Sequence, residues 1–298
     1  LNNLMRATGY PKKAMILALL SVLVNIILAP IFIFVLNWGI GGAALATICG
    51  QAISLVWHII HFREKSSFVH FDKNHNKFSW SIIKNVYSIG LSPFLMNVCA
   101  CIVVIFINKA LLETGGNDGE LAVGSYGIVN RVGMLFVMIV FGITQGMQPI
   151  AGYNYGAQQY HRVNQVLKLA IWGATIMTTL TFLVGELMPE IAVSIFTTDE
   201  GLIARAAEGF RIVVLVFPIV GFQMVTSNFF QSIGMANKAI FLSLTRQLLF
   251  LLPCLIFLPK FMGAAGIWWS MPISDLVSSM VAAVLLYKQY QAFKTHNS

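Results

Sequence analysis

Three ionisable residues lie within long apolar segments of the sequence: Arg131, Arg246 and Asp275. Charged side chains at membrane depth face the protein interior and need partners there. Arg246 and Asp275 lie on consecutive predicted helices, so we expect a structural ion pair across their hairpin. Contact between Arg246 and a substrate is the alternative interpretation.

Neutral polar side chains in the second half of the sequence are candidates for a substrate cavity. A site of broad specificity needs adaptable Met and aromatic walls and few fixed polar groups. The residues expected to line such a cavity are Asn97, Gln145, Gln148, Gln223, Gln231 and Arg246.

Patterns typical of enzymes and metal sites are missing from the sequence. It contains no His-Glu-x-x-His, no Gly-x-Ser-x-Gly and no paired acidic residues, so no enzymatic activity is expected. Four histidines lie close together in the sequence: His58, His61, His70 and His75. No Cys or carboxylate residues are spaced around them as further metal ligands would be. We therefore expect neither a metal nor a cofactor.

Composition indicates an all-α, multi-pass protein of the cytoplasmic membrane. Hydrophobic residues make up 57% of the sequence and charged residues 10%. The net charge of +8 comes from loop residues and not from a basic helix, which excludes nucleic acid as a partner. The bilayer is the expected environment, and the protein is expected to be a monomer.

Apolar runs predict eight membrane helices, at residues 14–36, 41–62, 82–112, 121–147, 163–187, 202–230, 239–258 and 263–287. Lys and Arg are concentrated in alternate loops, above all in the polar segment 62–80, and acidic residues gather in the other loops. The excess of positive charge predicts that this segment and both chain ends are cytoplasmic.

One helical hairpin occurs twice, at residues 3–42 and 228–266. A shift of 225 positions aligns Asn3 with Asn228, Gly9 with Gly234, Lys13 with Lys238, Ala14 with Ala239 and Leu17 with Leu242. A shift of 224 then aligns Gly39 with Gly263 and Gly42 with Gly266. Both copies run in the same direction, which predicts two lobes related as parallel repeats around a central cavity.

The repeat spacing also predicts that four spans, roughly 140 residues, precede Leu1. We therefore expect the chain to be the C-terminal two-thirds of a protein with about twelve spans. Residues 1–62 would end the first lobe, residues 63–80 would join the lobes, and residues 81–298 would form the second lobe.

From Gly142 the sequence reads Gly-Ile-Thr-Gln-Gly-Met-Gln-Pro-Ile-Ala-Gly-Tyr-Asn-Tyr-Gly-Ala. This segment resembles the Gln-Gly-x-x-Pro-x-x-Gly-x-x-x-Gly-Ala pattern that ends the eighth span in the MATE (multidrug and toxic compound extrusion) family. Leu-Met-Arg-Ala-Thr-Gly at Leu4 and Phe-Phe-Gln-Ser-Ile-Gly at Phe229 are also similar to that family. The resemblance implies antiport, in which a small organic and often cationic compound leaves the cell while Na+ or H+ enters.

The resemblance also implies an ion-coupling site in the first lobe. Family members use an Asn-x-x-x-Asp pair on the fifth span and Ala carbonyl and Thr oxygens on the sixth. The matching positions are Asn25 with Ala29, and Ala43 with Thr47. Ala29 replaces the Asp, so only neutral oxygens remain, and these hold Na+ poorly. Hydrogen bonding between helices is the alternative role for Asn25 and Thr47.

Two other functions are compatible with parts of the sequence. A flippase for lipid-linked saccharides would share the two-lobed build, but it would need a strongly cationic cavity. Arg131 and Arg246 provide only two positive charges for it. A membrane-embedded enzyme is the less favoured alternative, because the sequence lacks the catalytic patterns named above.

Overall fold

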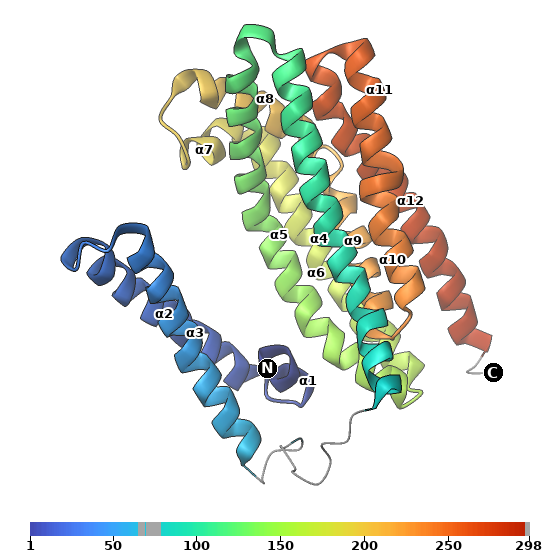
Figure 1. The fold of residues 1–298 in the computed structure, drawn as a ribbon. Helices are drawn as coiled ribbons and strands as arrows, with labels where there is room; N and C mark the ends of the chain where they lie inside the picture. Colours follow the sequence, from blue (N-terminus) through green and yellow to red (C-terminus); the bar gives the residue numbers. More distant parts are fainter. Residues whose placement is uncertain (65–68, 70–78, 296–298) are drawn as a thin grey trace. The chain divides into compact units, whose positions relative to one another are not determined.

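The computed structural model describes residues 1–64, 69 and 79–295, which are helical or form short turns and loops. The chain divides into two compact units, Leu1–Ser79 and Trp80–Ser298 (Figure 1). The segment predicted to join two lobes, residues 63–80, lies largely outside the described residues, as do His70 and His75.

The first unit is a helical hairpin preceded by a short helix. It consists of α1 (Asn2–Ala7), α2 (Pro11–Pro30), the π-helical segment η1 (Ile31–Val35) and α3 (Gly39–Arg63). The segment η1 begins directly after Pro30, which lacks an N–H and obstructs regular α-helical hydrogen bonding.

Glycines bring α2 and α3 into close contact. A Cβ atom on Gly50 would lie 2.5 Å from the carbonyl oxygen of Ser21, and one on Gly42 would lie 2.7 Å from that of Phe32. Only a residue without a side chain fits at such separations. The two helices are therefore held by backbone-to-backbone packing, as is common between helices in membranes.

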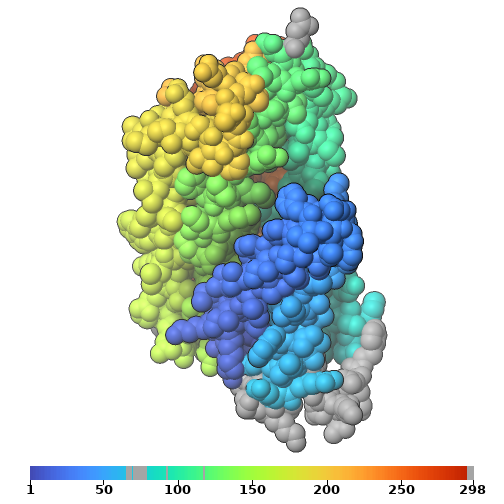
Figure 2. Space-filling model, turned by 90° about the vertical axis from the view of Figure 1, so that its left-hand side faces the viewer, coloured from blue at the N-terminus to red at the C-terminus, as the bar shows by residue number. Residues whose placement is uncertain are grey.

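The second unit contains the remaining helices, which lie side by side in Figure 1. They are α4 (Trp80–Thr114), α5 (Gly119–Gly156), α6 (Tyr160–Leu187), α7 (Pro189–Ser194), α8 (Glu200–Val214), α9 (Phe217–Ser232), α10 (Ala236–Leu244), α11 (Leu252–Met262) and α12 (Ala264–Thr295). The 3₁₀ turn η3 (Gly116–Asp118) precedes α5, and the π-helical segment η4 (Thr245–Leu251) joins α10 to α11. Figure 2 shows one face of this unit, with α5 in green and α6 in yellow-green.

Close packing of α6 against α9 forms the centre of the second unit. A Cβ atom on Gly221 of α9 would lie 2.7 Å from Thr178 Oγ1 and 2.9 Å from the carbonyl oxygen of Ala174, both on α6. Buried aromatic side chains, including Phe210 and Phe229, fill the space around this contact. The core thus fixes the position of α9, which carries several of the predicted cavity residues.

Among the described residues, seven helices are long and apolar enough to cross a membrane, and an eighth span results if α8 and α9 count as one. This confirms the prediction of an all-α membrane protein with eight spans. The axis bends by 59° between α8 and α9. Pro218, in the first turn of α9, prevents an unbroken helix there. Helix α4, by contrast, continues through Pro93.

The two hairpins repeat the same local geometry at the aligned positions. Gly9 and Gly234 have φ angles of 92° and 75°, values that favour glycine. The N–H of Tyr10 donates to the carbonyl of Met5 at 3.1 Å, and the aligned Met235 donates to that of Phe230 at 2.9 Å. These shared features are what a duplicated hairpin predicts.

Candidate functional site

The three predicted ion-coupling residues are linked by one hydrogen bond between α2 and α3 and one within α3. Asn25 Nδ2 donates to Thr47 Oγ1 at 3.0 Å, and Thr47 Oγ1 donates to the carbonyl oxygen of Ala43 at 3.0 Å. The amide oxygen of Asn25 takes part in neither bond. Ala29, one turn further along α2, provides only a methyl group. The arrangement therefore presents neutral oxygens within the first unit.

A hydrogen-bonded pair joins α5 to α9 in the second unit. Gln148 Nε2 donates to Asn228 Oδ1 at 3.1 Å, and Asn228 Nδ2 donates to the carbonyl oxygen of Met224 at 2.9 Å. Gln148 belongs to the Gln-Gly-Met-Gln-Pro segment of α5. Its partner Asn228 was not among the predicted cavity residues.

A small cavity of about 20 Å³ is lined by polar side chains of α9, α10 and η4, among them Gln223 and Asn228 of α9 and Arg246 of η4. Space of this size accommodates about one water molecule. Gln148 reaches the same place through its bond to Asn228. Gln148, Gln223, Asn228 and Arg246 thus form a polar cluster around one position. Substrate binding by Gln148, Gln223 and Arg246 stays a prediction.

A larger cavity of about 320 Å³ also borders Arg246 and lies between α4, α5, α8, α9, η4 and α12. Its volume is at the lower end of the range for small-molecule sites. The polar side chains that line it are those of Tyr126, Asn130, Arg246, Gln247 and Asp275, and its walls include Met134, Val137, Phe217, Leu251 and Met271. Gln247 Oε1 is buried without a hydrogen-bond partner among the described residues.

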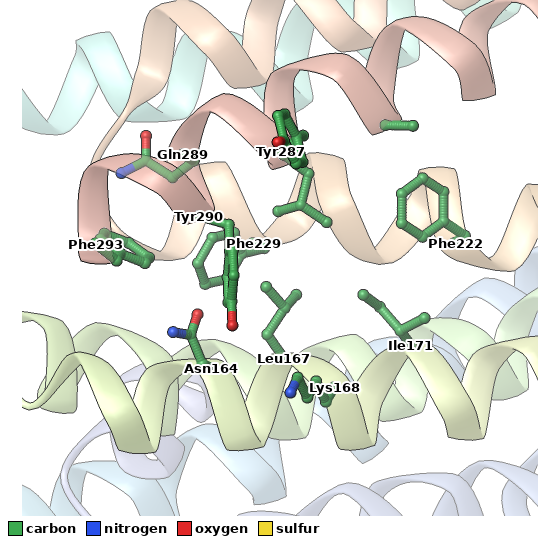
Figure 3. Close-up of a pocket in the computed structure, with 12 residues that line it drawn as sticks. Asn164, Leu167, Lys168, Ile171, Phe222, Phe229, Tyr287, Gln289, Tyr290 and Phe293 are labelled. Atoms are coloured by element: carbon green, nitrogen blue, oxygen red, sulfur yellow. The ribbon is translucent and has the colours of Figure 1, made fainter. Parts of the chain in front are cut away.

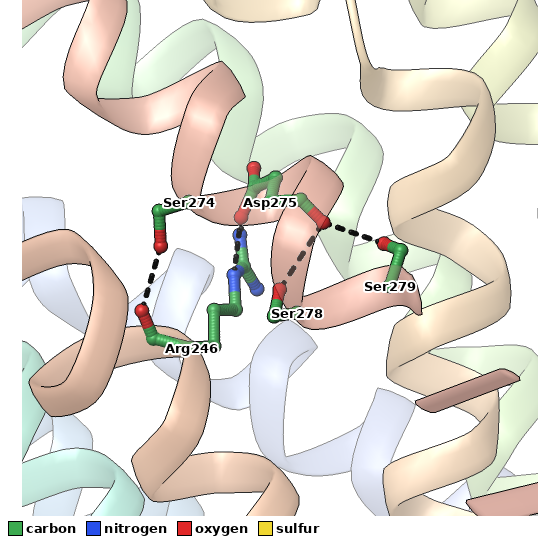
Figure 4. A network of polar contacts seen from close by, with 5 residues as sticks. All are labelled: Arg246, Ser274, Asp275, Ser278 and Ser279. Atoms are coloured by element: carbon green, nitrogen blue, oxygen red, sulfur yellow. Dashed lines mark hydrogen bonds and ion pairs between the residues drawn. The ribbon is translucent and has the colours of Figure 1, made fainter. Parts of the chain in front are cut away.

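Arg246 and Asp275 form the predicted ion pair at the wall of this cavity (Figure 4). Arg246 Nε lies 2.6 Å from Asp275 Oδ1, and Nη2 lies 3.3 Å from Oδ2, so the contact is bidentate. The side chains are only 26% and 10% exposed. In this shielded contact each charge neutralises the other, so that neither is unpaired at membrane depth.

Serine hydroxyls of α12 reinforce the backbone around the pair. Ser274 Oγ donates to the carbonyl oxygen of Arg246 at 2.7 Å, which joins α12 to η4. Ser278 and Ser279 donate to the carbonyl oxygen of Asp275 at 3.1 Å and 2.7 Å (Figure 4). These bonds fix the backbone from which both charged side chains extend.

The other predicted cavity residues lie elsewhere. Asn97 is exposed on α4, and its Nδ2 donates to the carbonyl oxygen of Pro93 in the same helix at 2.7 Å. Gln145 and Gln231 are half-buried and line neither of the two cavities described above. A role of these three residues in substrate binding stays a prediction. Arg131 is exposed at the surface of the second unit.

Asn130, Asn228 and Gln247 are among the polar side chains of these cavities that the sequence does not single out. A usable signal existed for Gln247, because Ser243, Arg246 and Gln247 have the spacing of one helix face. The spacing of Ser274, Asp275 and Ser278 on the facing helix is similar. No comparable signal pointed to Asn228, whose partner lies 80 residues away.

Of the four histidines considered as metal ligands, the two that the structure describes, His58 and His61, lie near the end of α3. His58 Nδ1 lies 2.6 Å from the carbonyl oxygen of Ser54, and the ring of His61 meets that of Tyr10 edge-on at 4.8 Å between centroids. Within residues 1–64, 69 and 79–295, no three His, Cys, Asp or Glu side chains gather as a metal site.

Comparisons with known proteins place these features in a family context. The family model MatE matches residues 88–256. The multidrug export protein MepA of Staphylococcus haemolyticus is 28% identical over 282 residues, which cover 95% of this chain and 61% of that protein. MepA of Staphylococcus aureus (strain N315) is 26% identical with the same coverage. The chain thus spans about 61% of the length of these curated relatives.

Solved structures give a similar result. The MATE multidrug transporter DinF-BH, solved in complex with R6G, is 36% identical with a TM-score of 0.86, and the match covers 98% of this chain and 65% of that one. A MATE structure in complex with MaL6 has a TM-score of 0.90 at 24% identity, covering 99% and 66% of the two chains. The second likeness concerns the fold alone.

Removal of one partner of the ion pair should destabilise the protein more than removal of both. Asp275→Leu alone leaves the Arg246 charge buried and should lower the free energy of unfolding by about 3–5 kcal/mol. Adding Arg246→Met should recover most of this loss. Unfolding in detergent micelles measures both changes.

The exposed pair Lys109–Glu113, with side chains 71% and 67% exposed, is the matched control. Its single substitutions should change the free energy of unfolding by less than about 1 kcal/mol. Equal losses for the single and double variants of Arg246 and Asp275 would show that the two charges do not stabilise each other.

Proposed function

The chain belongs to the MATE family, and on this premise we propose that it is part of a multidrug efflux transporter in the cytoplasmic membrane. The proposed substrates are small organic compounds, which cross the membrane without a chemical reaction. The observation that carries the proposal is the match of the family model to residues 88–256, which contain α5, α9 and the whole polar cluster. Fold alone would not suffice, because one fold serves many functions.

The cavity of about 320 Å³ beside Arg246 is the proposed substrate site. Its walls are mostly aliphatic, aromatic and Met side chains, which adapt to ligands of different shape. Asp275 is the one acidic side chain among its lining residues. A cationic substrate would therefore be attracted to Asp275, in competition with the Arg246 guanidinium.

The same pairing argues against a flippase for lipid-linked saccharides. Pyrophosphate carriers would need several uncompensated cations in the cavity. Arg246, the basic side chain that lines the cavity, is already bound to Asp275. Organic cations are therefore better matched to the charges of this site than polyphosphates are.

We further propose that the Asn25, Ala43 and Thr47 network is part of the site that couples efflux to entry of Na+ or H+. Coupling requires an ion that binds the alternating arrangements of a transporter with different affinity. The network supports this role because the Thr47 hydroxyl joins the two helices: it accepts from Asn25 Nδ2 and donates to the carbonyl oxygen of Ala43. Since these groups are neutral, an acidic side chain from another part of the complete protein would have to complete the site.

The proposed orientation places the α5–α6 loop in the cytoplasm. Single cysteines at Gln159, in that loop, and at Thr198, before α8, would report the two sides, since both positions are exposed. In a background without the native cysteines, an impermeant maleimide should label position 198 in intact cells and position 159 only after permeabilisation. The opposite pattern would reverse the topology.

Efflux of a fluorescent organic cation from cells that lack their own exporters tests the function. Expression of the protein should lower dye accumulation, and absence of this effect would refute the proposal. Met134→Trp should reduce efflux severalfold, because an indole would fill the cavity that Met134 lines. Met138→Trp is the matched control, since Met138 is equally exposed on α5 and lines neither cavity. Similar activity of the two variants would place the substrate elsewhere.

Restoring the family's carboxylate tests the coupling site. Ala29→Asp places an acid one helical turn from Asn25. An unpaired Asp at the bilayer centre costs about 3 kcal/mol, which a bound cation would offset. The variant should therefore raise the apparent affinity for Na+ or shift the pH dependence of efflux. Ala29→Asn is the uncharged control. If neither property changes in the folded Asp variant, Asn25 and Thr47 act only in helix packing.

A further inference from the structure

A second cavity lies in the same unit but shares no residue with the one beside Asp275. It is a groove of about 310 Å³ between α6, α9 and α12 (Figure 3). Leu167 and Ile171 of α6 form one wall, Leu286 of α12 forms the other, and Phe222 and Phe229 of α9 form the floor. Its interior is therefore almost entirely apolar.

The polar groups of the groove gather at one end. Figure 3 shows the Tyr290 hydroxyl beside Asn164 and Lys168, all three of which line the groove. Lys238 adds a second positive charge behind this end, where its Nζ donates to Gln289 Oε1 at 2.7 Å. The lining residues include no Asp or Glu. This end therefore attracts anions and repels organic cations.

The surfaces on both sides of the groove are exposed and apolar. Leu169 and Trp172 extend from α6, and Met280 and Val284 extend from α12. In a bilayer such surfaces contact lipid chains, so the groove is accessible to lipid. Along α12 the lining residues run from Ala283 to Phe293, a rise of about 15 Å. This is half of the hydrocarbon core of about 30 Å, or the depth of one leaflet.

We propose that this groove binds one anionic phospholipid. An acyl chain lies between Ile171, Leu286 and the floor of α9, and the headgroup phosphate accepts hydrogen bonds from Lys168 Nζ and Asn164 Nδ2. Basic pockets between membrane helices bind anionic headgroups in this way. The charge count of the loops assigns Lys168 to the cytoplasmic side, so the lipid belongs to the inner leaflet.

Native mass spectrometry of the detergent-purified protein tests the site with two lipids of identical acyl chains, phosphatidylglycerol and phosphatidylcholine. The wild-type protein should retain phosphatidylglycerol severalfold more than phosphatidylcholine. Lys168→Ala should abolish this preference, because it removes the cation at the headgroup. Lys84→Ala, a substitution of an exposed lysine in the first turns of α4, should leave the preference unchanged.

A second pair of variants tests the position of the acyl chain. Ala283→Trp should reduce the retention of both lipids, since Ala283 is exposed and an indole there fills the groove. Val284→Trp changes the next residue of α12, which does not line the groove, and should have no effect.

Two results would overturn the proposal. Equal effects of Lys168→Ala and Lys84→Ala would show that surface charge in general attracts the lipid. Unchanged lipid retention in Ala283→Trp would show that no chain occupies the groove. Neither measurement depends on transport, so the lipid site is tested independently of the efflux function.

Discussion

The contact between Arg246 and Asp275 is the constraint around which the second unit is arranged. Two charges within apolar helices are stable only when they meet each other and when the backbone holds both in register. The register comes from α12, whose Ser274 hydroxyl donates to the carbonyl of Arg246 at 2.7 Å. Arg246, on the π-helical segment η4, lines two cavities, one small and one larger, and so does Gln247. These two residues thus connect the polar cluster to the proposed substrate site.

Small side chains allow the helices of the second unit to pack closely around the ion pair. Gly221 allows α9 to lie against the backbone of α6, which places Gln223 and Asn228 at the polar cluster. In lipid the hydrophobic effect does not drive helices together, so such close approach and the buried hydrogen bonds provide the association. The groove between α6 and α12 is lined by larger side chains, among them Leu167, Ile171 and Leu286.

Physical rules of the bilayer explain how much of this structure could be predicted from the sequence. The length of apolar runs predicted the spans, and the need to pair buried charges predicted the contact between Arg246 and Asp275. The expected span 202–230 is bent by 59° between α8 and α9, beside Pro218. Helix α5, however, continues beyond residue 147 to Gly156, since Pro149 is tolerated inside it. The bond from Gln148 to Asn228 depends on the relative rotation of two helices that are distant in sequence. Local sequence patterns do not determine that rotation.

The two hairpins differ most where α2 and α3, or η4 and α12, come closest. In the first hairpin Gly50 lies against the carbonyl of Ser21, and the separation admits no side chain. The aligned positions in the second hairpin are Ser274 and Arg246, where a hydroxyl bridges the gap to the same carbonyl. The position next to Gly50 is Gln51, which aligns with Asp275. A hydroxymethyl group in place of a hydrogen atom thus lies next to a buried guanidinium and carboxylate. The two hairpins are therefore chemically unequal at matching positions, neutral in the first copy and charged in the second.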